Sequence, residues 1–96
     1  MKINNEVLEV IHNQAAQRFE LFIGEFTAVL DYRLQGKTIV FTHTGVHRAL
    51  EGNGIGSFLV QAGLNYAREK KYSVMPLCSF VAAYIRRHPD YAEPLK

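Results

Sequence analysis

The sequence predicts an α/β (α+β) fold with a mixed sheet, in which antiparallel N-terminal strands lead into a parallel strand-helix-strand crossover and a C-terminal helix. The first half is rich in β-branched and aromatic residues with an alternation typical of half-buried strands. After residue 54 the apolar period changes to three and four residues, which is typical of a helix. Because a short apolar run follows that helix, we expect the strands on either side of it to lie parallel.

Four strands are predicted in the first half, at residues 7–12, 18–23, 26–34 and 38–46. The turns between them fall at residues 13–14, 24–25 and 35–37, and the last two contain glycine, which accepts the positive φ of tight hairpins.

An amphipathic helix is predicted from residue 54 to residue 71, with its apolar face formed by Ile55, Phe58, Leu59, Ala62 and Tyr66. A fifth strand follows at residues 72–75 and should stop at Pro76, which lacks the N–H group that a central ladder requires. A second helix, from residue 79 to residue 88, should end before Pro89.

Length and composition predict one folded domain over residues 1–96, with 48% hydrophobic and 21% charged residues. The longest apolar run, residues 80–85, is far shorter than a membrane span, so no membrane partner is expected. One cysteine excludes an internal disulfide and favours a reducing, cytoplasmic location. We expect a monomer or a weak homodimer.

The charge distribution bears on the class of partner. A net charge of +2 is too small for a dedicated nucleic-acid binder, so no nucleic acid is expected. Residues 1–45 carry −1 and residues 46–96 carry +3, so an anionic ligand should meet the second half. His12 and His47 have no cysteine or carboxylate cluster at ligand spacing, so no metal site is predicted.

A glycine-rich loop separates the fourth strand from the first helix, where a mixed sheet tends to bind ligands, near Val46 and Met75. Alternate glycines uncover backbone N–H groups beside a helix N-terminus, which suits an anion. The glycines could equally supply only a tight turn and close helix packing. The loop lacks the spacing of a Walker A or dinucleotide motif. It consists of Glu51, Gly52, Asn53, Gly54, Ile55, Gly56 and Ser57.

Residues 51–56, placed after a β-rich half and before an amphipathic helix, resemble the acetyl-CoA pyrophosphate loop of the GNAT acetyltransferase superfamily. More narrowly, residues 41–44, 76–80 and 84–89 are similar to short, single-domain, YjdJ-like members, and the resemblance spans roughly residues 19–91. It implies a GNAT-like fold that binds acetyl-CoA or coenzyme A and acetylates a small-molecule or peptide amine. Glu51 departs from the Arg or Gln usual at that position.

Cys78 is expected at the start of the second helix, where the helix N-terminus stabilises a thiolate. The resemblance implies a position beside the thioester, so this sulfur could be acetylated transiently. The alternative is a buried cysteine that acts as a small hydrophobic residue.

His43 falls on the alternation of Ile39, Phe41 and Gly45, and its near-neutral ordinary pKa suits it to take a proton from an amine or from Cys78. A structural histidine is the alternative. Tyr84 approximates the tyrosine that protonates the departing coenzyme A thiolate in larger GNAT enzymes, although an aromatic core residue explains it as well.

Arg86, Arg87 and His88 form a basic cluster at the end of the second helix. Arg87 and His88 could hold a phosphate of the cofactor, whereas the alternatives are a solvated face or complementing the negative helix end.

Two classes of function follow. In the first, acetyl passes from acetyl-CoA to a primary amine, either directly with His43 or water as base, or through acetyl-Cys78. In the second, the protein is a non-catalytic module that binds coenzyme A or another phosphorylated ligand and regulates a partner. A purely structural role needs no ligand at all.

Overall fold

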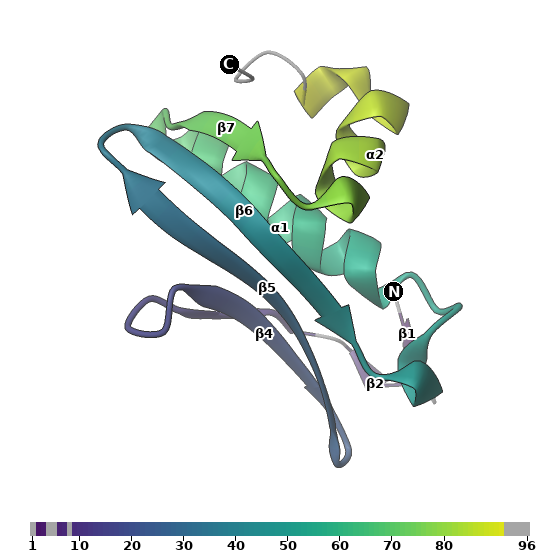
Figure 1. Ribbon diagram of the computed structural model, residues 1–96. Coiled ribbons are helices and arrows are strands. Elements are labelled where there is room, and N and C mark those ends of the chain that lie inside the picture. The colour runs from purple at the N-terminus through teal and green to yellow at the C-terminus, as the bar shows by residue number, and fades with distance from the viewer. Residues whose placement is uncertain (1, 4–5, 8, 92–96) are drawn as a thin grey trace.

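The computed structural model describes residues 2–3, 6–7 and 9–91. Its main sheet has five strands in the order β3-β4-β5-β6-β7 (Figure 1). The strands of this sheet are β3 (Ile11–Asn13), β4 (Arg18–Ile23), β5 (Phe26–Gln35), β6 (Thr38–Val46) and β7 (Ser73–Pro76). Neighbours pair antiparallel from β3 to β6, and β6 pairs parallel with β7. The predicted mixed sheet with a parallel crossover is confirmed.

Two helices follow the antiparallel strands. α1 (Ile55–Lys70) connects β6 to β7, and α2 (Ser79–Arg87) follows β7. Both agree with the predicted helices to within a residue at each end. The short helices η1 (Arg48–Leu50) and η2 (Pro89–Tyr91) lie before α1 and after α2, and β1 (Lys2–Ile3) forms a separate hairpin with β2 (Glu6–Val7).

The strand predicted at residues 7–12 is present with different bounds, because β2 ends at Val7 and β3 runs only from Ile11 to Asn13, while residue 8 lies outside the described residues. The turn after it is also longer than the predicted pair 13–14. The Asn13 side chain accepts a hydrogen bond from the Ala16 amide at 3.1 Å, and Gln17 takes a left-handed φ of 56°. The side chain of Asn13 thus stabilises a wider turn than its place in an alternating pattern suggests.

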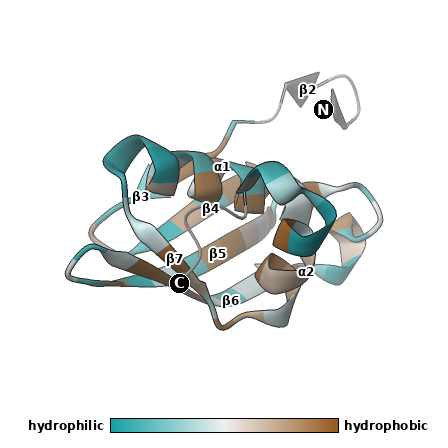
Figure 2. Cartoon of the chain, turned by 90° about the horizontal axis from the view of Figure 1, so that it is seen from above, coloured by the Kyte–Doolittle hydropathy of each residue, from teal (hydrophilic) through white to brown (hydrophobic). Residues whose placement is uncertain are grey.

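The core lies between α1 and one face of the sheet. Alternate residues of the central strands, among them Leu21, Leu30 and Phe41, are fully buried beneath Leu59 and Leu64 of α1. Figure 2 shows α1 lying across the sheet, with brown, hydrophobic residues on the strands beneath it. The helix approaches closely at Gly63, where an added Cβ would lie 2.9 Å from both Leu30 Cδ2 and Phe41 Cε1.

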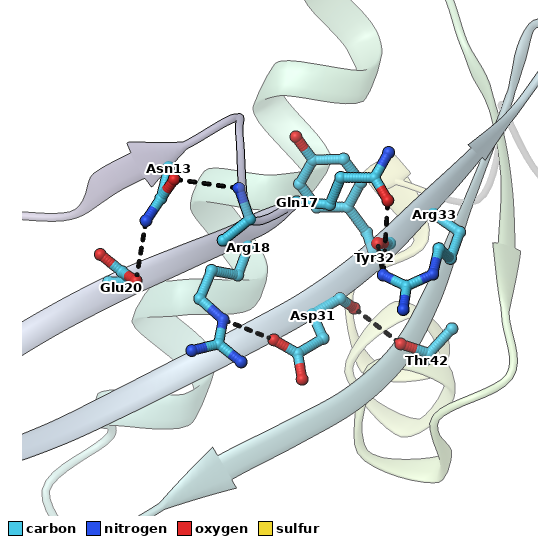
Figure 3. Close-up of polar contacts among 9 residues, drawn as sticks. Asn13, Gln17, Arg18, Glu20, Asp31, Tyr32, Arg33 and Thr42 are labelled. Atoms are coloured by element: carbon cyan, nitrogen blue, oxygen red, sulfur yellow. Dashed lines mark hydrogen bonds and ion pairs between the residues drawn. The ribbon is translucent and has the colours of Figure 1, made fainter.

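A β-bulge interrupts the pairing of β5 with β6. Tyr32 is opposite Phe41, but the preceding residue, Asp31, is opposite His43, so Thr42 is an extra residue in β6. The Thr42 hydroxyl donates a hydrogen bond to the Asp31 carbonyl oxygen at 3.3 Å (Figure 3). A residue inserted on one strand moves every later side chain to the other face. The bulge therefore sets which face the last third of β6 presents to the core.

The predicted alternation through His43 is wrong for this reason. Phe41 points into the core, whereas His43 is exposed and pairs with Asp31 on the outer face of the sheet. Thr44 instead is opposite the buried Leu30 and faces the helices.

The outer face of the sheet is polar where β3, β4 and β5 meet. Arg18 Nε donates to Asp31 Oδ1 at 3.0 Å, and Asn13 Nδ2 donates to Glu20 Oε2 at 3.2 Å (Figure 3). Cross-strand pairs of this kind fix the register of neighbouring strands. Within the described residues, the helices fall short of the length and apolarity needed to cross a bilayer.

We expect Gly63→Leu to lower the free energy of unfolding by about 2–3 kcal/mol, because the new side chain must displace Leu30 and Phe41 in a filled core. Gln61→Leu, at an exposed position of the same helix, should change it by less than about 0.5 kcal/mol. Urea denaturation measures both, and equal effects of the two substitutions would contradict the close approach of α1 to the sheet.

Candidate functional site

A cleft of about 590 Å³ opens where the end of β6 meets the start of α1. Four of its lining residues are glycines, so backbone makes up much of its wall. Val46 lines the cleft, and so do all residues of the predicted loop, 51–57, except Asn53. The lining residues are Thr44, Gly45, Val46, Leu50, Glu51, Gly52, Gly54, Ile55, Gly56, Ser57 and Phe80.

The loop is held in shape by Asn53. Its side-chain amide donates to the carbonyl oxygens of Leu50 at 3.1 Å and Glu51 at 3.4 Å, which stabilises the turn between η1 and α1. Gly54 is the N-cap residue of α1 and takes a left-handed φ of 73°, a conformation that costs a glycine little. The turn therefore directs the beginning of α1 at the cleft.

The N-terminus of α1 makes this end of the cleft suitable for an anion. The Phe58 amide donates to the Gly54 carbonyl at 3.0 Å, and the three amides before it, at residues 55–57, have no earlier helical carbonyl to bind. The first turn of α1 contains no acidic residue, so nothing there opposes the positive end of the helix dipole. Glu51 is exposed, which lets its carboxylate turn to water.

One edge of β6 forms the opposite wall. The ladder between β6 and β7 ends at Phe41 and Pro76, and the Cys78 amide then donates to the Phe41 carbonyl at 3.1 Å. Beyond that point β6 continues to Val46 while the chain turns into α2. The stretch from Thr44 to Val46 thus faces the cleft in place of a neighbouring strand, and such an edge can bind the amides of an extended ligand.

Cys78 lies beside the cleft as the half-buried N-cap residue of α2. Its sulfur is 3.3 Å from the hydroxyl oxygen of Thr44, which lines the cleft. Burial raises the pKa of the Cys78 thiol, but the Thr44 hydroxyl and the backbone of Val81, Phe80 and Thr44 outweigh burial and hold the pKa below its ordinary value.

Thr44 and Phe80 are site residues that the sequence analysis missed. Thr44 reaches the cleft only because of the bulge at Thr42, which no residue pattern in β6 announces. The Phe80 ring covers Gly56, where an added Cβ would lie 2.8 Å from the ring Cζ, so these two residues form one wall together. The signal available in the sequence was an aromatic residue two positions after Cys78, and the structure leaves Phe80 40% exposed.

His43 lies next to the cleft on the outer side of β6. Its ring packs over Gly45, since a Cβ added there would be 3.2 Å from His43 Nε2. The exposed imidazole is therefore separated from the cleft by the Gly45 backbone.

The structure does not bring Tyr84, Arg87 or His88 to the cleft lining. Tyr84 is buried in the core and its ring stacks on that of His88, with centroids 4.0 Å apart. His88 and Arg87 are exposed at the opposite end of α2 from Cys78.

Comparison with known proteins now bears on this geometry. Residues 18–94 match the model of the GCN5-related N-acetyl-transferase domain, which is most of the chain. The chain belongs to this family. Among its relatives, Protein NATD1 of Gallus gallus is 30% identical over 94 residues, covering 93% of this chain and 86% of the relative. Protein NATD1 of Homo sapiens is also 30% identical, with 93% and 83% covered.

A solved structure within the family has the same fold. The solution structure of a GCN5-like protein from Staphylococcus aureus superposes with a TM-score of 0.74 at 26% sequence identity, covering 98% of this chain and 91% of that one. The family match and this superposition confirm, at the level of family and fold, the resemblance that the glycine loop indicated. GCN5-related N-acetyltransferases generally use acetyl-CoA.

We expect the Cys78 thiol to ionise at a lower pH in the folded protein than in the urea-unfolded chain, because the Thr44 hydroxyl and the amides of α2 favour the thiolate. The measurement is the rate of alkylation by iodoacetamide against pH, and the single cysteine makes the readout specific to Cys78. A midpoint in the folded protein equal to or above that of the unfolded chain would contradict the contacts described above.

Proposed function

We propose that this member of the GCN5-related N-acetyltransferase family binds acetyl-CoA in the cleft and transfers the acetyl group to a primary amine of a small molecule or peptide. The observation that carries the proposal is the convergence on one cleft of a glycine loop, a helix N-terminus and an unpaired strand edge. Each of these provides backbone donors or acceptors, and together they fit a long ligand that carries phosphates at one end and amides along its length.

The cleft suits acetyl-CoA in size and in chemistry. Its volume of about 590 Å³ lies within the usual range for small-molecule sites, about 300–1,000 Å³. Amides at residues 55–57 would bind the pyrophosphate, and the edge of β6 from Thr44 to Val46 would pair with the pantetheine amides. The thioester would then lie toward Cys78, because Thr44 borders both the cleft and the sulfur.

In the covalent route, the Cys78 thiolate attacks the acetyl carbonyl carbon and forms a new C–S bond. The C–S bond to coenzyme A breaks, and coenzyme A leaves as a thiolate that takes up a proton. An amine then attacks acetyl-Cys78, loses a proton to His43 or to water, and releases the Cys78 thiolate. The lowered pKa of the Cys78 thiol supports this route, because it favours the thiolate that attacks in the first step.

In the direct route, the amine attacks acetyl-CoA itself, and His43 or water again takes the proton. The role of His43 as base stays a prediction, because its exposed ring lies on the outer side of β6 with the Gly45 backbone between the ring and the cleft. The role of Tyr84 as proton donor to coenzyme A stays a prediction. So does the binding of a cofactor phosphate by Arg87 and His88.

We expect Gly54→Glu to weaken coenzyme A binding by about tenfold or more, because the carboxylate would lie where the pyrophosphate binds. Gly36→Glu is the matched control. Gly36 also has a left-handed φ, of 61°, and the substitution adds the same charge in a hairpin turn far from the cleft. Isothermal titration calorimetry measures both affinities. Unchanged affinity in Gly54→Glu would contradict the assignment of the loop.

Incubation with acetyl-CoA should add one acetyl group to the protein, located on Cys78 by digestion and absent from Cys78→Ala. Intact-mass spectrometry measures the adduct, and a chase with amine should remove it if the covalent route operates.

The other outcomes separate the remaining possibilities. No adduct, but coenzyme A thiol released when polyamines, peptides or small amines are added, would support direct transfer. Binding of coenzyme A with neither adduct nor acceptor-dependent release would instead support the non-catalytic module, and absence of binding would exclude both forms of the proposal.

A further inference from the structure

Thr44 occupies a position that links the cleft to the only cysteine of the chain. Its hydroxyl oxygen is 3.3 Å from the Cys78 sulfur, and the same residue lines the cleft. Thr42, two residues earlier on β6, has a hydroxyl that binds the Asp31 carbonyl on the other face of the sheet. The two threonines differ in orientation because β6 has a bulge, one extra residue opposite β5, at Thr42.

The direction of this hydrogen bond follows from the chemistry of the two groups. An S–H group is a weak donor, whereas a hydroxyl donates well and a thiolate accepts well. The backbone of Val81 and Phe80, in the first turn of α2, also favours negative charge on the sulfur. Either atom could donate when the sulfur is protonated, but a thiolate can only accept, so the Thr44 hydroxyl is the donor whenever Cys78 is ionised.

Charged side chains contribute little to this environment. On β6, His43 and its partner Asp31 lie on the outer face of the sheet, away from the sulfur. Neither α1 nor α2 has an acidic residue in its first turn, and the basic residues Arg86 and Arg87 lie in the last turn of α2. Across the cleft, Glu51 is exposed. Hydrogen bonds and burial, and not ion pairs, account for the state of Cys78 in the described residues.

We propose that Thr44 is a positioning residue, whose hydroxyl holds the Cys78 sulfur as a thiolate at the end of the cleft where the acetyl group arrives. The function of the pair rests on the proposed acetyl transfer, but the hydrogen bond can be tested without acetyl-CoA. No residue pattern marks Thr44 for this role, and it depends on β6 carrying one extra residue before it.

The test compares Thr44→Val, which removes the hydroxyl at nearly constant volume, with Thr44→Ser, which keeps it. Thr38→Val is the matched control, because it removes a hydroxyl from the other end of the same strand and leaves the bulge at Thr42 unchanged. The readout is the rate of iodoacetamide alkylation of Cys78 against pH in the folded variants, without any acetyl donor.

We expect Thr44→Val to move the alkylation midpoint to higher pH and to lower the rate below that midpoint by about 3- to 10-fold. The plateau at high pH should stay equal or rise slightly, since a more basic thiolate is a better nucleophile. Thr44→Ser and Thr38→Val should keep the midpoint of the unchanged protein. If the substitution changed only how easily iodoacetamide reaches Cys78, the alkylation rate would change by the same factor at every pH.

The proposal is overturned if Thr44→Val leaves the midpoint unchanged, if Thr38→Val shifts it as much, or if Thr44→Ser fails to retain it. Failure of the proposed acetyl transfer gives a different result, in which the midpoint shifts as expected but the unchanged protein shows neither an acetyl adduct nor acceptor-dependent release of coenzyme A. Circular dichroism of each variant shows whether the fold is retained before the rates are compared.

Discussion

One extra residue in β6 determines the arrangement of the whole site. Up to Phe41 alternate side chains of the strand, those of Ile39 and Phe41, pack into the core, and at Thr42 the bulge reverses this alternation. Without the bulge, Thr44 would face the outer side of the sheet and the sulfur of Cys78 would lose its closest polar neighbour. A pleated strand has a period of two, so a single insertion exchanges every side chain that follows.

The same region of the sheet also creates the space that the site needs. The parallel ladder between β6 and β7 ends at Pro76, which cannot donate to a further pair, and the chain enters α2 immediately afterwards. Because β6 continues to Val46, its edge faces a cleft in place of another strand. The proline that ends β7 therefore shapes the cleft together with the glycines on its other side.

The N-termini of α1 and α2 are each suited to stabilise a different negative charge. α1 begins at Gly54 and presents free amides to the cleft, where the proposed pyrophosphate binds. α2 begins at Cys78, and its first turn stabilises charge on the sulfur. The helices are held in this relation by contacts that leave no room for a side chain, namely Phe80 on Gly56 and the sheet on Gly63. Both ends of the proposed reaction would thus depend on backbone dipoles that packing orients.

The sequence by itself determined the order and type of the elements in the main sheet from β4 onward, the parallel crossover and the glycine loop. Each of these depends on local chemistry, such as an apolar period, a glycine or a proline, that can be read from neighbouring residues. It did not determine the bulge, which turned His43 outward and Thr44 inward, or the wide turn after Asn13 that shortened β3. Nor did it separate Tyr84, Arg87 and His88 from the cleft. Only the tertiary structure decided these, because a bulge depends on the pairing of two strands and the face of a helix depends on what packs against it.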